Sequence, residues 1–232
     1  MSADIVLGAG AVVLEAALLS VLAYRKMWRT TPLFFSLVAW WLLSDLLQVW
    51  MQRYPSTRVA RFYALNTLAD AAVRCMVLAE LTWSLLRSYR KSLAAATVYL
   101  VGMTLVMGVL LCWPLASTAN PVEYPRIAGF ALQLNVSVSI VTVVCTTSLL
   151  VFARNMKVEW ARAERQVAWG LLVFYVISIL GAYSASILRR GANFSFEFVA
   201  HRIDLGVAVC FLVMLVYWIF SFRIGAKAEV RR

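Results

Sequence analysis

Histidine and cysteine, the residues most often used for metal binding and nucleophilic catalysis, are scarce in this 232-residue chain. The single histidine, His201, excludes a haem held by two histidines of the chain. A Ser–His hydrolase would have to use His201, and the sequence has no Gly-x-Ser-x-Gly turn for the serine. A zinc site would need His201 together with Glu197 and Asp204. The four cysteines form no CxxC pair and lie within apolar stretches, which is typical of packing residues. The sequence therefore predicts no enzyme, no metal site and no cofactor.

Charged residues are also few, at 14% of the chain, whereas hydrophobic residues make up 63%. A soluble domain has about 45–50% apolar residues, and one core of this size could not bury the excess. A transmembrane helix needs about 20 mostly apolar residues. Stretches of that length occur at residues 5–24, 32–51, 61–86, 93–115, 127–152, 167–188 and 198–222. We predict an all-α polytopic membrane protein whose single domain, residues 1–232, is a bundle of seven transmembrane helices.

No basic residue precedes the first stretch, and Glu15 interrupts its centre. A secretory signal would have a positive leading segment and a short uninterrupted apolar core. We therefore expect residues 5–24 to be a retained helix.

Basic residues are distributed unevenly between the loops on the two sides of the predicted bundle. With the amino terminus outside, the cytoplasmic segments carry fourteen Lys and Arg residues and the outer segments carry seven. Because cytoplasmic loops are enriched in Lys and Arg, this bias predicts an outer amino terminus and a cytoplasmic carboxyl terminus. We expect the plasma (cytoplasmic) membrane as the location.

The formal net charge of +11 would suggest nucleic-acid binding in a soluble protein. Here the basic residues are divided among short segments with no recognition motif, so we expect no nucleic-acid partner. The basic cytoplasmic loops are instead expected to contact anionic membrane lipids, and they offer a surface for a protein partner.

A weak internal repeat relates the two halves of the chain. A shift of 134 places residues 36–44 on 170–178, and a shift of 135 places Cys75 on Cys210 and Trp83 on Trp218. This pattern predicts a possible 3+1+3 parallel repeat, which is one way to build a transporter around a midplane site. The arrangement is similar to that of sugar-efflux and proline-glutamine-loop proteins. The chain has no Pro-Gln dipeptide, so the resemblance is one of architecture.

A seven-helix bundle in this orientation also resembles the rhodopsins and G-protein-coupled receptors. Retinal attachment needs a lysine in the seventh helix, and all four lysines of this chain lie in predicted cytoplasmic segments. A retinal Schiff base is therefore excluded. The third stretch ends in Leu86-Arg87-Ser88-Tyr89 rather than Asp-Arg-Tyr, and the seventh lacks Asn-Pro-x-x-Tyr.

Aromatic residues gather near the ends of several stretches, which predicts an interfacial belt. The belt comprises Trp28, Trp50, Tyr54, Trp83, Tyr89, Trp113, Trp160 and Trp218. The charged segment 154–166 is predicted to extend the fifth or sixth helix into the cytoplasm, with Met156 and Trp160 on one interfacial face.

Five acidic residues lie inside the apolar stretches, where a carboxyl costs several kcal/mol unless it is paired, protonated or hydrated. They are Glu15, Asp45, Asp70, Glu80 and Asp204. Asp70 and Arg74 are four residues apart and can pair on one helix face. Glu80 lies six residues after Arg74, which at 3.6 residues per turn places it on another face of the helix. We expect Glu15 and Glu80 to be structural or linked to a proton.

By depth, one set of polar residues belongs to the outer half of the predicted bundle. The set is Asp45, Asn66, Asp70, Arg74, Gln133, Asn135, His201 and Asp204. We hypothesise that these residues converge on one outward-opening cavity that binds or translocates a small solute or a proton. Arg74 would bind an anionic group or hold the acids charged, and the acids would carry protons or a cation.

Two alternatives remain open on the sequence. Asp70 and Arg74 could be a simple intrahelical pair, with Asp45 and Asp204 satisfied by neighbouring helices or water. The protein could also be a heptahelical sensor, or an accessory subunit of a larger membrane complex that acts through a partner protein.

Overall fold

The computed structural model describes residues 3–51, 56–86, 108, 126–155, 160–190 and 194–229. Long α-helices and one short 3-10 helix make up nearly all of these residues, among which there is no strand. The elements are α1 (Ala3–Tyr24), η1 (Met27–Arg29), α2 (Pro32–Met51), α3 (Ser56–Leu86), α5 (Arg126–Asn155), α6 (Arg162–Arg190) and α7 (Phe194–Glu229). The predicted all-α class is confirmed.

Six helices are long and apolar enough to cross a membrane within the described part of the chain. Large apolar side chains on these helices are exposed, among them Val13, Leu65 and Val213 at 63–67%. Since soluble monomers rarely expose apolar surface on this scale, the exposed faces fit contact with lipid. The chain is an integral membrane protein.

The helices extend beyond several of the apolar stretches that predicted them. Whereas α2 has the predicted bounds, α3 begins at Ser56 and α7 ends at Glu229, both outside the apolar stretch. Helical hydrogen bonds run along the backbone and continue into polar residues, whereas hydropathy marks only the part that can lie in lipid.

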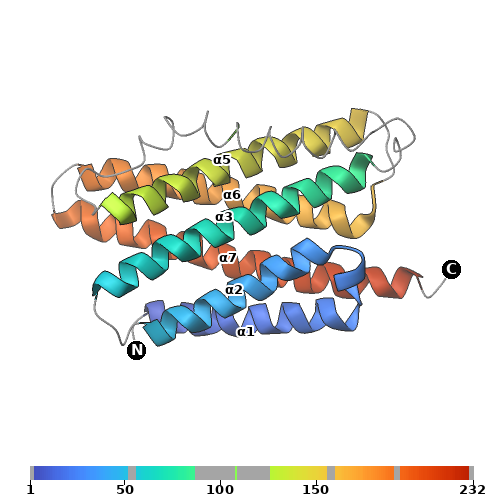
Figure 1. Ribbon diagram of the computed structural model, residues 1–232, viewed down its shortest axis with the longest axis horizontal. Coiled ribbons are helices and arrows are strands. Elements are labelled where there is room, and N and C mark those ends of the chain that lie inside the picture. Colours follow the sequence, from blue (N-terminus) through green and yellow to red (C-terminus); the bar gives the residue numbers. More distant parts are fainter. Residues whose placement is uncertain are drawn as a thin grey trace.

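Most of the fourth predicted stretch, residues 93–115, lies outside the described residues. Gly108 is helical, and a Cβ placed on it would lie 3.4 Å from a methyl group of Val141 in α5. Figure 1 shows that α3 ends and α5 begins at opposite ends of the bundle. This is the arrangement that a fourth span predicts, although the seventh helix, the repeat and the orientation remain predictions.

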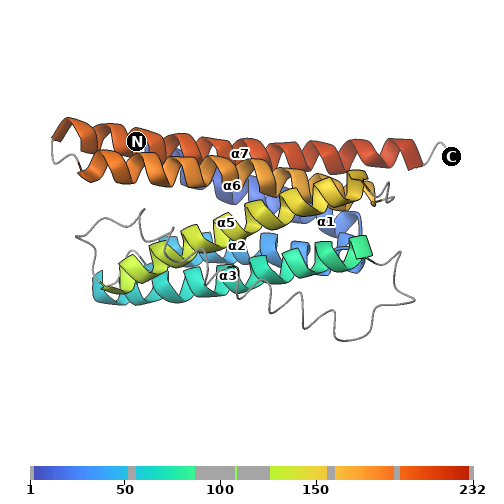
Figure 2. The same ribbon diagram turned by 90° about the horizontal axis from the view of Figure 1, so that it is seen from above.

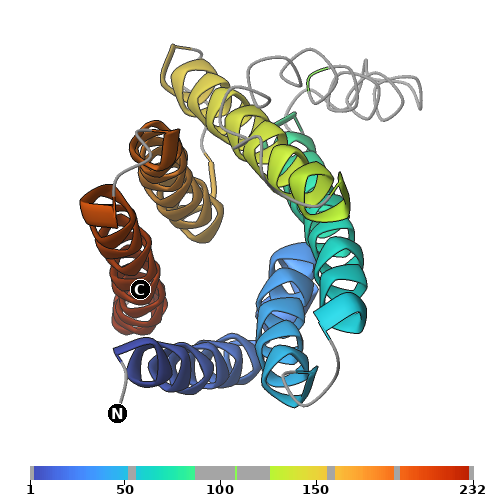
Figure 3. The same cartoon turned by 90° about the vertical axis from the view of Figure 1, so that its left-hand side faces the viewer.

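The six helices form a ring in the order α1, α2, α3, α5, α6, α7, and α7 closes the ring against α1 (Figure 3). Figures 1 and 2 show that the helices run roughly along one long axis. We call the end of the bundle where α1 begins the first end, and the end where α2 begins the second end. Helices α3, α5 and α7 also begin at the first end, which the charge bias predicts to be the outer one.

Aromatic side chains fill much of the space between α2, α6 and α7. Trp218 of α7 is fully buried and packs edge-on against Phe34 of α2, with 5.0 Å between ring centroids. Trp41 of α2 lies 5.5 Å from Phe211 and stacks on Trp218 at 6.2 Å. The Trp218 indole donates to the carbonyl of Gln166 at 3.2 Å. These contacts connect α2 with α7, which are not neighbours in the ring.

Two members of the predicted interfacial belt are therefore placed wrongly by the sequence. Trp218 is 0% exposed and Trp160 is 9% exposed, and both belong to the hydrophobic core. Nearness to the end of an apolar stretch marks depth along the bundle, whereas the direction of a side chain depends on which helix faces it. Trp28 and Trp50, at 49% and 52% exposed, do lie on the surface. Met156 lies outside the described residues.

Candidate functional site

Asp70 and Arg74 form an ion pair on α3, at the spacing that the sequence indicated. The Arg74 guanidinium also donates to Asn135 Oδ1 at 2.9 Å and to Ser139 Oγ at 3.4 Å, both on α5. Trp41 Nε1 of α2 donates to Asp70 Oδ1 at 3.0 Å. Both charged side chains are 11% exposed. The pair is thus the centre of a buried network that joins three helices.

A fourth helix completes this network through an aromatic ring. The Arg74 guanidinium carbon lies 4.9 Å from the centre of the Tyr175 ring of α6, at cation–π distance. Protein groups therefore surround the guanidinium, and only its Nε lacks a hydrogen-bond partner among the described residues. Charge-assisted hydrogen bonds of this kind fix the relative positions of the helices that supply them. The geometry favours a structural role for Asp70, Arg74 and Asn135.

Asn66, one helical turn before Asp70, makes a separate connection between α3 and α2. Its amide donates to Ser44 Oγ at 2.6 Å. Ser44 is buried at 7% exposure. Asn66 therefore acts as an interhelical contact in this arrangement.

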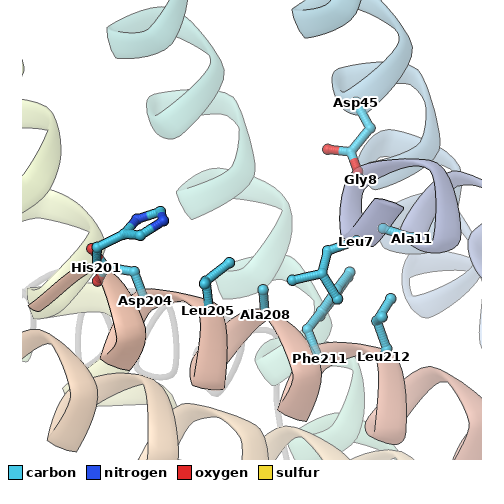
Figure 4. Close-up of a pocket in the computed structure, with 10 residues that line it drawn as sticks. All are labelled: Leu7, Gly8, Ala11, Asp45, His201, Asp204, Leu205, Ala208, Phe211 and Leu212. Carbon is cyan, nitrogen blue, oxygen red and sulfur yellow. The ribbon is translucent and has the colours of Figure 1, made fainter. Parts of the chain in front are cut away.

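Three other predicted residues line a pocket of about 360 Å³ between α1, α2 and α7, at the first end of the bundle. They are Asp45 of α2 and both His201 and Asp204 of α7. The remaining lining residues are Leu7, Gly8, Ala11, Leu205, Ala208, Phe211 and Leu212. Figure 4 shows His201 and Asp204 at one margin, Asp45 at the other above Gly8, and apolar side chains between them.

The pocket combines acidic margins with an apolar wall. Among the described residues, the ionisable groups that line the pocket are two carboxyl groups and one imidazole, and no lysine or arginine lines it. A carboxylate at the edge of a low-dielectric wall attracts a positive charge more strongly than the same group would in open water. Such an arrangement can hold a cation whose body is apolar.

The eight outer-half residues thus do not share one space. Asp45, His201 and Asp204 face the pocket, whereas Asp70, Arg74 and Asn135 face one another. Phe211 connects the pocket with the ion-pair network. It lines the pocket and packs against Trp41, whose indole donates a hydrogen bond to Asp70. Gln133 is half-buried on α5. The side chain of Glu197 lies outside the described residues.

Glu80 has a role that residue spacing on its own helix could not reveal. Its carboxylate oxygens accept hydrogen bonds from the backbone N–H groups of Leu33 at 3.3 Å and Phe34 at 3.1 Å. These are unpaired donors in the first turn of α2, and an anion is also favoured there by the helix dipole. Glu80 of α3 thus caps the start of α2. Of the two roles expected for Glu80, structural or linked to a proton, this contact supports the structural one. The matching depth of Pro32 and Glu80 was the available sequence signal.

Glu15 lies closer to the candidate site than the sequence suggested. Leu7, Ala11 and Glu15 are spaced four residues apart on α1, so they share one face. Glu15 is one turn deeper than the pocket wall and is 1% exposed. It interacts electrostatically with Asp45.

Among the side chains that the structure describes, no three His, Cys, Asp or Glu residues are grouped to hold a metal ion. No family model, curated protein or solved structure matches the chain. The fold and site therefore define the class directly: a helical integral membrane protein with a buried ion-pair network and an acidic pocket at one end.

Proposed function

We propose that this membrane protein binds a small organic cation in the pocket between α1, α2 and α7. The observation that carries the proposal is the combination of Asp45 and Asp204 with an apolar wall in a pocket of about 360 Å³. An ammonium group would lie against a carboxylate, and its hydrocarbon body would lie against Leu205 and Phe211. On the orientation predicted from loop charges, the pocket opens toward the outer side.

Arg74 already has its partners in the ion-pair network, which favours a cation in the pocket over an anionic solute bound at Arg74. Asp70 already balances the Arg74 charge, and Asn135, Ser139 and Tyr175 occupy other positions around the guanidinium. An anion would have to displace partners that are held in place by three helices. A cation in the pocket would leave these partners of Arg74 in place.

The test uses three probes of one shape and different charge: benzylammonium, benzyl alcohol and benzoate. Binding to the purified full chain in detergent is measured by isothermal titration calorimetry, with a micelle-only titration subtracted. Benzylammonium is expected to bind at least tenfold more tightly than either other probe, a difference of about 1.4 kcal/mol. Equal binding of all three probes would show that the carboxyl groups do not select charge.

Charge-removing variants locate the site. Asp45→Asn and Asp204→Asn are each expected to weaken benzylammonium binding about tenfold, since each removes a carboxylate from the pocket margin. Glu164→Gln is the matched control, because it removes the same charge from the start of α6, at the second end. An equal loss in the control, or unchanged binding in both pocket variants, would refute the proposed site.

A further inference from the structure

Glu15 is the buried acidic group that the contacts described above leave unexplained. Its side chain is 1% exposed, and its Oε2 atom has no hydrogen-bond partner among the described residues. Burying an ionised carboxylate without partners is expensive, both in a protein core and in a bilayer. A proton on the carboxyl group would remove the charge.

The ionisable groups on the neighbouring helices leave Glu15 without an opposite charge of its own. On α2, Asp45 is the only acidic or basic side chain, and it interacts electrostatically with Glu15. Helix α7 contributes His201 and Asp204 at the pocket margin and exposed Arg202 beside them. Among the side chains of α7 that the structure describes, the other ionisable groups are Cys210 and Tyr217 deeper along the helix and Arg223 near the second end. Within α1 there is no lysine or arginine.

Two carboxyl groups in this environment favour a state with one proton between them, because two like charges away from water repel each other. Asp45 borders the pocket, whereas Glu15 lies one turn deeper and is almost fully enclosed. The more enclosed carboxyl is the costlier one to ionise. Glu15 is thus the member of the pair suited to hold the proton while the pocket is empty.

We propose that Glu15 is a proton-binding site, and that a cation entering the pocket beside Asp45 displaces its proton. The exchange balances: the Glu15 O–H bond breaks, the electron pair stays on the carboxylate, and the proton leaves through the pocket to water. One positive charge enters as one leaves, so the net charge of the site is unchanged. The displacement rests on the proposed cation binding, whereas the proton on Glu15 does not.

The first measurement tests the proton without any ligand. The infrared spectrum of the full chain in detergent at neutral pH is expected to contain the carbonyl stretch of a protonated carboxylic acid, which Glu15→Gln removes. Glu15→Asp, which keeps an acid but changes its surroundings, is expected to shift the same band. Absence of the band in the wild-type protein, or its persistence unchanged in both variants, would overturn the proton site.

The second measurement tests the displacement. Benzylammonium is titrated calorimetrically in phosphate and in Tris, whose different ionisation heats reveal protons released on binding. The wild-type protein is expected to release up to one proton per cation, and Glu15→Gln is expected to bind the cation with no release. Unchanged release in Glu15→Gln would overturn the displacement and leave cation binding intact. An infrared band without benzylammonium binding would retain the proton site and reject both cation binding and displacement.

Discussion

The Arg74 network offers the sharpest test of whether the buried ion pair is structural or belongs to the ligand site. The substitution Arg74→Met keeps a long apolar side chain but removes the guanidinium. Asp70 would retain only the hydrogen bond from Trp41, at 3.0 Å, among the contacts of the network. Its carboxylate would therefore remain buried without an opposite charge.

The size of the effect follows from the burial of the pair. Removing one partner of a buried ion pair typically costs about 3–5 kcal/mol, because the remaining charge is left unpaired. The Asp70 side chain is 11% exposed, so water cannot replace the guanidinium without a change in packing. We expect Arg74→Met to lower the free energy of unfolding by about 3 kcal/mol or more.

A double-mutant cycle separates the pair from its surroundings. Asp70→Asn with Arg74→Met leaves no unpaired charge, so its loss is expected to be smaller than the sum of the single losses by about 2 kcal/mol. Unfolding is followed in dodecylmaltoside by titration with dodecyl sulfate and circular dichroism. Arg61→Met is the control, since Arg61 is exposed on the same helix, and its effect is expected to stay within about 0.5 kcal/mol.

Binding of benzylammonium is measured on the same variants. A structural network predicts that Arg74→Met protein that remains folded binds the probe with unchanged affinity. If Arg74→Met unfolds no more easily than the wild-type protein but loses probe binding, the separation of network and pocket is wrong.

Three further predictions use the same unfolding and binding measurements. Glu80→Ala is expected to lower the free energy of unfolding by about 2 kcal/mol or more, because two backbone N–H groups of α2 lose a charged acceptor. Glu80→Gln is expected to lower it by less. Equal losses in the two variants would show that the charge of the cap is unimportant. Gly170→Ala is expected to lower the free energy of unfolding by about 1–3 kcal/mol, since the added methyl would overlap the Trp218 ring. Gly206→Ala is the control, because a Cβ at Gly206 meets nothing within 4 Å. Gly8→Leu is expected to reduce benzylammonium affinity at least tenfold with an unchanged unfolding midpoint, because an added Cβ at Gly8 meets nothing within 4 Å and the longer side chain would occupy the pocket; full binding in this variant would place the ligand elsewhere.

Local patterns in the sequence were sufficient for the helices and for contacts within one helix. Apolar length located the six spans that the structure describes, because the thickness of the bilayer fixes how many residues a helix needs. The Asp70–Arg74 pair followed from four-residue spacing, which brings two side chains together whatever surrounds them. Each of these inferences depends on the geometry of a single helix.

Relations between helices needed the tertiary structure. Depth along the bundle places Asp45 and Asp70 in the same half. Depth does not show that Asp45 borders a pocket between α1 and α7, whereas Asp70 binds Arg74 and Trp41 of α2. Glu80 reaches a helix that begins 48 residues earlier in the chain, and Trp218 turns inward instead of toward an interface. The sequence by itself determined a helical membrane protein carrying buried acids. The packing of helices around the ring decided which acid is capped, which is paired and which borders a pocket, because the direction of each side chain depends on how its helix is rotated against its neighbours.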